Sequence, residues 1–363
     1  MSLTRRSFSL LTAAGLGLGV ALGAMSATAA DKLKVGFVYV GPIGDHGWSY
    51  QHDQGRLAVE KHFGDKVETT YVESVPEGAD AERVIRSLAQ KGHDLIFTTS
   101  FGYMNPTIKV AKQFPKVKFE HATGYKRSKN VATYLSRTYE GRYISGYLAA
   151  KMSKTGTVGY IASFPIPEVI RDINSVMLGM QSVRPDMKMK IIWVNSWFDP
   201  GKEAAAAKVM IGQGVDVILQ HTDSPAAMQV AQKEKIWAVG QASDMRAFGP
   251  DAHLTSVIDD WAPYYIKRVQ SLMDGTWTAS DHWGGMPEGD IVIGPIHANV
   301  PADIKAGAEK LIAGLKAKSF HPFTGPIANQ AGKVIVPAGK TMTDGELAGM
   351  NWYVKGVEGS IPK

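Results

Sequence analysis

The stretch TYVESVPEGADAERVIRSLAQKGHDLIF, residues 70–97, recurs without a gap as IWVNSWFDPGKEAAAAKVMIGQGVDVIL, residues 192–219. The identical positions are Val72 and Val194, Ser74 and Ser196, Gly92 and Gly214, Asp94 and Asp216, and Ile96 and Ile218. Each copy predicts a strand, a short loop, a helix that a glycine ends, and a second strand. The repeat therefore favours two similar α/β lobes in one chain, with two unrelated units of one larger sheet as the alternative.

The repeat extends outward from this stretch. Apolar runs that open with Val-Gly begin at Val35 and at Val158. A capping side chain followed by proline, the pattern of a helix start, occurs at Asn105 and again at Ser224. Strands that alternate with helices in this way predict parallel, doubly wound sheets, so we expect an α/β fold. Two such lobes would face each other across a cleft, and such clefts are where small ligands bind.

The lobe boundaries follow from the places where the pattern restarts. We expect a first lobe of residues 31–139 and about 255–290, a second lobe of residues 140–254 and about 291–320, and a C-terminal extension of residues 321–363 packed on one lobe. In this scheme the predicted strand Thr255–Ile258 returns the chain to the first lobe. The sequence contains no low-complexity linker, so several short crossings must join the lobes.

Residues 1–30 have the pattern of a secretory signal peptide. Arg5 and Arg6 precede the apolar segment Leu10–Met25, and the small-residue cleavage pattern Ala27–Ala29 follows. The paired arginines favour twin-arginine export, with an ordinary Sec signal as the alternative. The chain has no cysteine, hence no disulfide and no lipid-anchored cysteine after the signal. We therefore expect an exported, soluble periplasmic protein without a lipid anchor.

Charge and motif content argue against nucleic-acid binding and against catalysis. The net charge is +6, but the lysines are scattered and form no basic block. His46 and His52 are six residues apart, which suits neither one helical face nor a usual metal site, so we expect two surface histidines. No zinc-protease, nucleophile-elbow or phosphate-loop motif occurs. We expect no enzymatic activity, no metal and no cofactor.

In open parallel sheets, ligands bind outside the carboxyl ends of the strands. This rule selects the loops Gly41–Trp48, Ser74–Pro76, Ser100–Tyr103, Ser163–Pro167, Asn195–Asp199, His221–Ser224 and Gln241–Met245. Together these loops hold several aromatic rings beside a few carboxylates. Aromatic faces stack on a planar ring, and a carboxylate accepts hydrogen bonds from N–H or hydroxyl groups. The loops therefore predict a flat ligand that donates hydrogen bonds.

Seven residues are the candidates for ligand contact: Asp45, Trp48, Phe101, Gly102, Trp197, Asp223 and Asp244. Trp48 follows Gly47 at the mouth of the first strand and predicts a stacking platform, with packing on the sheet as the alternative. Trp197 takes the place that Val75 has in the first copy, so it would make the cleft asymmetric. Asp45 could instead cap the helix that begins near Trp48.

Several motifs in a fixed order carry a family likeness. They are KVGFVYVGPIGDHGWSYQHDQGR, DLIFTTSFGYM, TYEGRYISGYLAAKMSKTGTVGYIAS, NSWFDPGKE, VGQASDM and LTSVIDDW. In this order and spacing the chain resembles the basic membrane protein family of substrate-binding proteins for ABC transporters, which includes purine nucleoside receptors. The likeness runs over essentially the whole mature chain. It implies the type I periplasmic binding protein fold, two doubly wound lobes around a hinged cleft with three crossings.

The resemblance also implies roles for particular residues. Family members hold a purine between aromatic rings and fix its polar atoms with carboxylates. By this likeness Asp45 and Trp48 match the acid and the aromatic of the first loop. Trp197, with Phe198 as a neighbouring candidate, matches the aromatic of the second lobe, and Asp244 matches the acid after the Val-Gly pair.

One departure from the family pattern bears on the ligand. Relatives that bind nucleosides usually carry a lysine near the ribose, after a strand with the residues TSV. Here the TSV at 255–257 is followed by Ile258, Asp259 and Asp260. We therefore expect a free purine base, such as adenine or hypoxanthine, rather than a nucleoside.

Other readings of the function stay open. A purine nucleoside receptor and a carbohydrate receptor of the same fold are the first alternatives, since tryptophan also stacks on sugar rings. An exported nucleoside hydrolase or the ligand domain of a membrane sensor would be a different class of protein. The expected partners are the small-molecule ligand and the ABC permease subunits of the inner membrane, with no nucleic acid. We expect a monomer.

Overall fold

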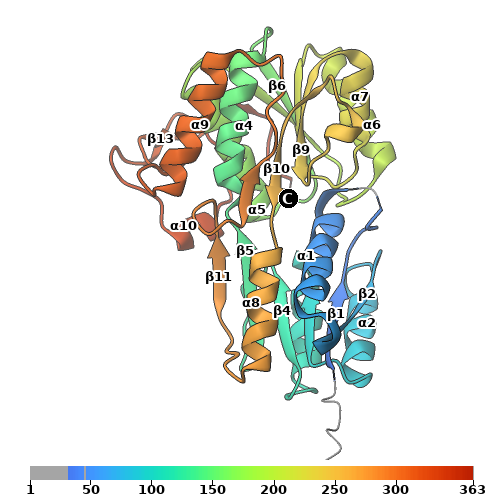
Figure 1. The fold of residues 1–363 in the computed structure, drawn as a ribbon. Helices are drawn as coiled ribbons and strands as arrows, with labels where there is room; N and C mark the ends of the chain where they lie inside the picture. Colours follow the sequence, from blue (N-terminus) through green and yellow to red (C-terminus); the bar gives the residue numbers. More distant parts are fainter. Residues whose placement is uncertain (1–31, 45, 363) are drawn as a thin grey trace, which may run out of the picture. The chain divides into compact units, whose positions relative to one another are not determined.

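The computed structural model describes residues 32–44 and 46–362, and these form two lobes, each built on one sheet (Figure 1). The signal peptide expected at residues 1–30 lies outside the described residues. Within the described residues, no helix combines the length and the apolar character needed to cross a membrane.

The first lobe has a parallel sheet of six strands. Their order is β11 (Asp281–Gly284), β5 (Val131–Ser136), β4 (Lys118–Ala122), β3 (Leu95–Thr98), β1 (Leu33–Val38) and β2 (Val67–Val72). Two pairs of packed helices accompany the sheet: α1 (Gly47–Phe63) with α8 (Ala262–Met273), and α2 (Ala79–Gln90) with α3 (Met104–Ala111). Helix α2 buries Ala81, Ile85 and Leu88, which share one helical face, against this sheet.

The second lobe repeats this architecture. The strand order is β12 (Ile291–Ile293), β10 (His253–Asp259), β9 (Trp237–Ala242), β8 (Val217–Gln220), β6 (Thr157–Ala162), β7 (Lys188–Trp193) and β15 (Val357–Glu358). The helices are α4 (Thr138–Met152), α5 (Pro167–Gln181), α6 (Pro200–Gly212), α7 (Ala226–Glu234) and α9 (Ala302–Lys316). All strand pairs are parallel except β10 with β12.

The sequence repeat is a structural repeat. Its two copies are β2-α2-β3 and β7-α6-β8. The two sheets also share a strand order, because β2-β1-β3-β4-β5 in the first corresponds to β7-β6-β8-β9-β10 in the second. Gly92 and Gly214 both have positive φ, 79° and 87°, where the chain turns from the helix into the next strand. The prediction of two doubly wound α/β lobes is confirmed.

The structure differs from the expected boundaries at one strand. Thr255–Ile258 was expected to return to the first lobe, but β10 pairs with β9 and β12 of the second sheet. The chain returns one element later, with α8, whose N-cap residue Trp261 and first-turn residue Tyr265 are buried in the first-lobe core. The sequence of β10, which mixes polar and apolar residues, does not reveal which of two similar sheets the strand joins.

The C-terminal extension packs on the second lobe. It contains β13 (Ile327–Ala328), β14 (Val334–Val336) and α10 (Asp344–Ala348). Phe323, Leu347 and Tyr353 are buried in the same apolar cluster as α4 and α5, and β15 adds a strand beside β7. The extension therefore enlarges the core of the second lobe.

Three crossings connect the lobes, between β5 and α4, between β10 and α8, and between β11 and β12. Hydrogen bonds tie them to one another. The Ser136 hydroxyl donates to Asp259 Oδ1 over 2.7 Å, and the Asp260 N–H donates to the Asp290 carbonyl over 2.9 Å. The Arg137 N–H donates to the Gly284 carbonyl over 2.6 Å. The crossings therefore form one hydrogen-bonded strip at the centre of the molecule.

Burial raises the pKa of Asp259, in the second crossing, to about 8. In the unfolded chain this carboxyl group loses its proton near pH 4, whereas in the folded protein it keeps the proton up to about pH 8. The contribution of Asp259 therefore lowers the free energy of unfolding as the pH rises from about 4 to about 8. Asp259→Asn keeps the acceptor for Ser136 and removes the ionisation. We expect the variant to melt a few degrees above wild type above about pH 8 and to approach it near pH 5. Calorimetric melting at a series of pH values checks this, and a difference independent of pH would contradict it.

Candidate functional site

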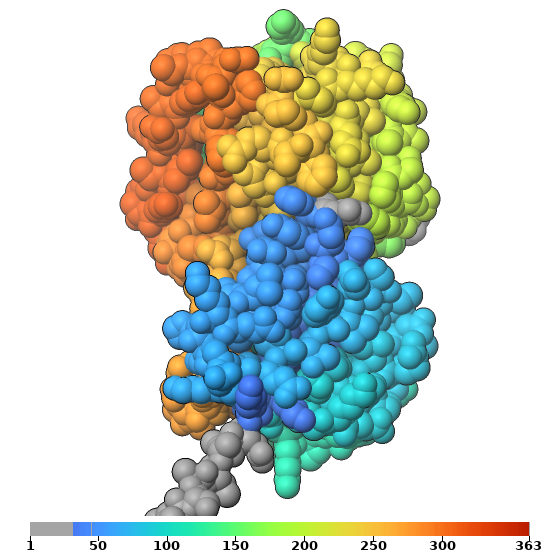
Figure 2. Space-filling model, turned by 45° about the vertical axis from the view of Figure 1, so that its right-hand side comes forward, coloured from blue at the N-terminus to red at the C-terminus, as the bar shows by residue number. Residues whose placement is uncertain are grey.

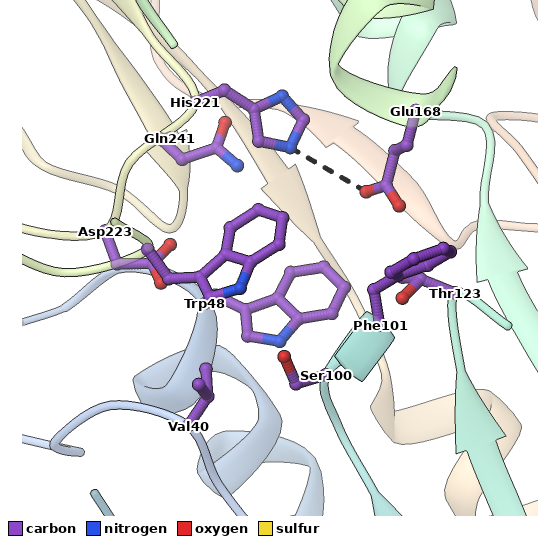
Figure 3. Close-up of a pocket in the computed structure, with 10 residues that line it drawn as sticks. Val40, Trp48, Ser100, Phe101, Thr123, Glu168, His221, Asp223 and Gln241 are labelled. Carbon is purple, nitrogen blue, oxygen red and sulfur yellow. Dashed lines mark ion pairs between the residues drawn. The ribbon is translucent and has the colours of Figure 1, made fainter. Parts of the chain in front are cut away.

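A cavity lies between the carboxyl ends of the two sheets. Figure 3 shows the side chains that converge on it from both lobes. The first lobe contributes Val40, Trp48, Ser100, Phe101 and Thr123. The second lobe contributes Glu168, Trp197, His221, Asp223 and Gln241. A ligand in this cavity would contact both lobes at once.

Trp48 is fixed by the first lobe. It lies in the first turn of α1, and its indole N–H donates to the Thr99 carbonyl over 2.5 Å. The ring meets the buried Trp261 edge to face, with centroids 5.5 Å apart. The protein thus uses the polar atom of the indole, and the ring contributes aromatic surface to the cavity.

Trp197 projects from the loop between β7 and α6, and its indole N–H also forms a hydrogen bond within the protein. The indole donates to Glu77 Oε1, on the first lobe, over 3.2 Å, and its ring is tilted against Phe164 at 5.0 Å. The same Glu77 oxygen accepts hydrogen bonds from the Ser100 hydroxyl and from the Gly102 N–H. Glu77 therefore organises the aromatic loops of both lobes, although sequence reasoning did not select it.

Phe101 lies among the residues that line the cavity, and Gly102 does not. Both belong to the short 3₁₀ helix Phe101–Tyr103 that follows β3. The contribution of Gly102 is its N–H, which donates to Glu77 over 2.9 Å and so sets the course of the loop beside Phe101.

Asp223 is one of two buried acids, with Glu168, that line the cavity. Burial, and after it the nearby Glu203, raises the pKa of Asp223 well above its ordinary value, while the Trp48 backbone N–H that donates to its carboxylate acts in the opposite direction. The Asp223 N–H also donates to the Trp197 carbonyl over 2.9 Å. A carboxyl group with a raised pKa can donate a hydrogen bond when protonated and accept hydrogen bonds when ionised.

The structure does not bring Asp244 to the cavity wall. Its carboxylate accepts from the backbone N–H and the guanidinium of Arg246, both over 3.0 Å, at the start of the 3₁₀ helix Arg246–Phe248. Local pairing with Arg246 holds the side chain there. Asp45, the remaining candidate, lies outside the described residues.

The candidates from the sequence did not include five polar residues that line the cavity: Ser100, Thr123, Glu168, His221 and Gln241. The selected loops contained His221 and Gln241, and Glu168 directly follows another of them. His221 Nε2 lies 3.7 Å from Glu168 Oε1 (Figure 3), and its Nδ1 lies 3.4 Å from Asp172 Oδ2. Asp172 in turn pairs with the fully buried Arg142 at 3.2 Å. The rule for strand ends finds loops, but it does not say which side chain of a loop points inward.

His52 is not a surface histidine, contrary to the sequence-based expectation. It is fully buried, its Nδ1 lies 2.5 Å from the Tyr265 hydroxyl, and its ring stacks on Trp261 at 4.7 Å. Burial lowers its pKa well below the ordinary value. The reason is that α1 turns this face toward α8. His46 is half-buried and stacks on Tyr50.

These groups suit binding rather than bond breaking. The cavity holds two fixed indoles, a phenyl ring, two carboxyl groups and one carboxamide, drawn from two lobes with three short crossings. Fold and site together define a two-lobed receptor for a small molecule. The profile of the PnrA-like ABC transporter substrate-binding proteins, the Bmp family, matches residues 32–316, and the chain belongs to this family.

Known proteins of related sequence and structure agree with this family. The chain is 57% identical over 352 residues to "Purine-binding protein BAB2_0673" of Brucella abortus, covering 97% of this chain and 99% of that protein. It is 42% identical over 275 residues to "Putative ABC transporter glucose-binding protein TsgA13" of Haloferax volcanii, covering 76% and 70%. The fold resembles that of a solute-binding protein of Aeropyrum pernix K1, with a TM-score of 0.68 at 19% identity, over 88% of this chain and 98% of that one.

The family membership confirms the resemblance seen in the sequence and settles the class. The protein is a substrate-binding protein and not an enzyme. Membership also implies a small-molecule ligand and the permease subunits of an ABC transporter as partners.

Replacement of Trp197 tests whether its ring forms part of the ligand site. We expect Trp197→Ala to weaken ligand binding by about 1–3 kcal/mol, because stacked aromatic area is lost. Trp197→Phe should recover part of this loss, since it keeps a ring but not the hydrogen bond to Glu77. Titration calorimetry gives the affinities, and Trp237→Ala, at the amino end of β9, is the control. Unchanged affinity in Trp197→Ala would make Trp197 a purely structural residue.

Proposed function

We propose that this protein is the periplasmic receptor of an ABC importer for purines, with a free base such as adenine or hypoxanthine as its ligand. The observation that carries the proposal is the cavity between Trp48 and Trp197, whose indole N–H groups are both bonded within the protein. The two rings thus offer aromatic surface to a flat ligand, and the nearby carboxyl groups offer hydrogen bonds to its polar edge.

The charge of the cavity favours a neutral ligand that donates hydrogen bonds. None of the ten described residues that line it is lysine or arginine, whereas Glu168 and Asp223 supply carboxyl groups. Arg127, Arg137 and Arg171 lie outside this set, in a neighbouring cavity that shares Phe101, Thr123 and Glu168 with it. An amino group or a ring N–H of a purine suits the two carboxyl groups.

Nucleoside-binding relatives carry a lysine near the ribose, and this chain has no lysine at that position, which supports a free base as the ligand. Here the TSV residues of β10 lead into the crossing at Asp259 and Asp260. Asp259 is buried and accepts a hydrogen bond from the Ser136 hydroxyl, so its side chain stabilises the crossing between the lobes. No cation extends from this position toward a ribose.

The named relatives support two ligand classes to different extents. The Brucella abortus protein, called purine-binding, is the more similar and covers nearly the whole chain. The Haloferax volcanii protein, called a putative glucose-binding protein, favours a sugar as the second candidate. The two tryptophans are compatible with a sugar ligand, because their rings also stack on sugar rings. However, the residues that line the cavity offer few of the amide and guanidinium groups that bind the hydroxyl groups of a sugar.

The mechanism that we propose is closure of the two lobes over the ligand. A ligand that contacts both lobes only in the closed form shifts the equilibrium toward that form. The closed protein then docks on the permease subunits and releases its purine. Export by a signal peptide would place the protein in the periplasm, where such receptors act.

Calorimetric titration of the mature protein, refolded after unfolding to remove bound ligand, tests the proposal. The panel is adenine, hypoxanthine, guanine, adenosine, guanosine, glucose and ribose. We expect binding of a base at micromolar or tighter affinity, about 8 kcal/mol or more, and none of its nucleoside.

Each outcome of this titration has a definite meaning. Binding of nucleosides alone would retain a purine receptor and overturn the free-base assignment. Binding of sugars alone would overturn the purine class in favour of the carbohydrate alternative.

A further inference from the structure

The amino end of α1, on the first lobe, is hydrogen-bonded to the second lobe. The N–H of Gly47 donates to the Ser243 hydroxyl over 2.7 Å, and the N–H of Trp48 donates to the Asp223 carboxylate. Ser243 directly follows β9, and α1 contacts β9. In Figure 2 the blue surface that contains α1 abuts the yellow surface of the second lobe. The second lobe thus supplies acceptors for the first N–H groups of a first-lobe helix.

Gly47 is the residue that permits this contact. A Cβ at this position would lie 2.2 Å from the backbone carbonyl oxygen of Asp223 and 3.0 Å from its Cα. These are backbone atoms, so no side-chain rotation relieves the overlap. Any other residue here would therefore force the loop that carries Asp223 away from α1, and with it the second lobe.

We propose that Gly47 and Ser243 are positioning residues for ligand capture: the second lobe caps α1 when the lobes close, and only glycine at position 47 allows that approach. The inference rests on the proposed closure mechanism and deepens it. Neither residue lines the cavity. Both would act on affinity through the fraction of molecules that can close.

The cap and the ligand site share two residues. Asp223 accepts from the first turn of α1 and lines the cavity, and Trp48 belongs to that turn and lines the cavity as well. A ligand held between them favours the same arrangement that caps the helix. Because apparent affinity scales with the population of the binding-competent form, loss of the cap weakens binding without loss of a ligand contact.

The same helix provides a matched control. Gly64, at the other end of α1, also has positive φ, 55° against 80° at Gly47, but a Cβ there would meet no atom within 4 Å. Both substitutions place an L side chain at positive φ, and only Gly47→Ala also blocks the contact between the lobes.

Affinity for adenine and hypoxanthine is the first measurement. We expect Gly47→Ala to raise the Kd at least 10-fold and Gly64→Ala to leave it within about 2-fold of wild type. Ser243→Ala, which loses one capping bond, should raise the Kd roughly 2- to 30-fold. Ser319→Ala, an exposed serine of the second lobe, is its control. Equal affinities in wild type, Gly47→Ala and Ser243→Ala would overturn the inference and leave the purine receptor standing.

The distance between the lobes is the second measurement, and it does not require a known ligand. The chain has no cysteine, so Arg83→Cys on α2 and Lys208→Cys on α6 give one spin-label pair across the lobes. We expect Gly47→Ala to shift the distance distribution away from that of wild type and Gly64→Ala to leave it unchanged. If wild type binds no purine, the proposed function fails, and this measurement still decides the inference. Identical distributions in both glycine variants would overturn it.

Discussion

The direction of the strands is the constraint on which the site depends. Strands β1, β3, β6, β7 and β8 run parallel to their neighbours, and each is followed by a helix, so these helices begin at the cleft. Helix N-termini carry partial positive charge and N–H groups without intrahelical partners. Acids lie at three of these ends: Asp223 at α1, Glu168 in the first turn of α5, and Asp199 as the cap of α6. The topology thus accounts for carboxyl groups near a cavity whose ten described lining residues include no lysine or arginine.

Behind the cavity the second lobe holds charges away from water. Arg142 and Asp172 are fully buried and paired at 3.2 Å, and the Thr138 hydroxyl completes the set by donating to Asp172 over 2.9 Å. His221 connects this pair to Glu168 at the cavity wall. Removing one partner of a buried ion pair destabilises a protein far more than the intact pair stabilises it. The network therefore fixes one arrangement of these side chains. It gives the ligand a rigid wall on the second-lobe side.

Sequence reasoning recovered the repeat, the two sheets and the loops that meet, because these depend on periodicity and strand direction. Of its candidates, the structure places Trp48, Phe101, Trp197 and Asp223 on the cavity wall, each after a predicted strand or at the start of a predicted helix. Sequence reasoning placed β10 in the other lobe, because the residues of one short strand fit either of two similar sheets. It also passed over Glu77, since the importance of a carboxylate in a loop appears only when partners distant in sequence, such as Trp197, are brought to it.

The sequence repeat pointed to the role of Glu77 in the contact between the lobes. Glu77 and Asp199 occupy equivalent positions in the two copies, and each acid follows the first strand of its unit. Asp199 caps its own helix by accepting the Lys202 N–H over 3.0 Å. Glu77 instead accepts from Gly102 of its own lobe and from Trp197 of the other. Equivalent positions of the repeat therefore serve contact between lobes in one copy and local helix stability in the other. The site arises where the two copies differ, because a symmetric pair of lobes could not hold an asymmetric ligand in one orientation.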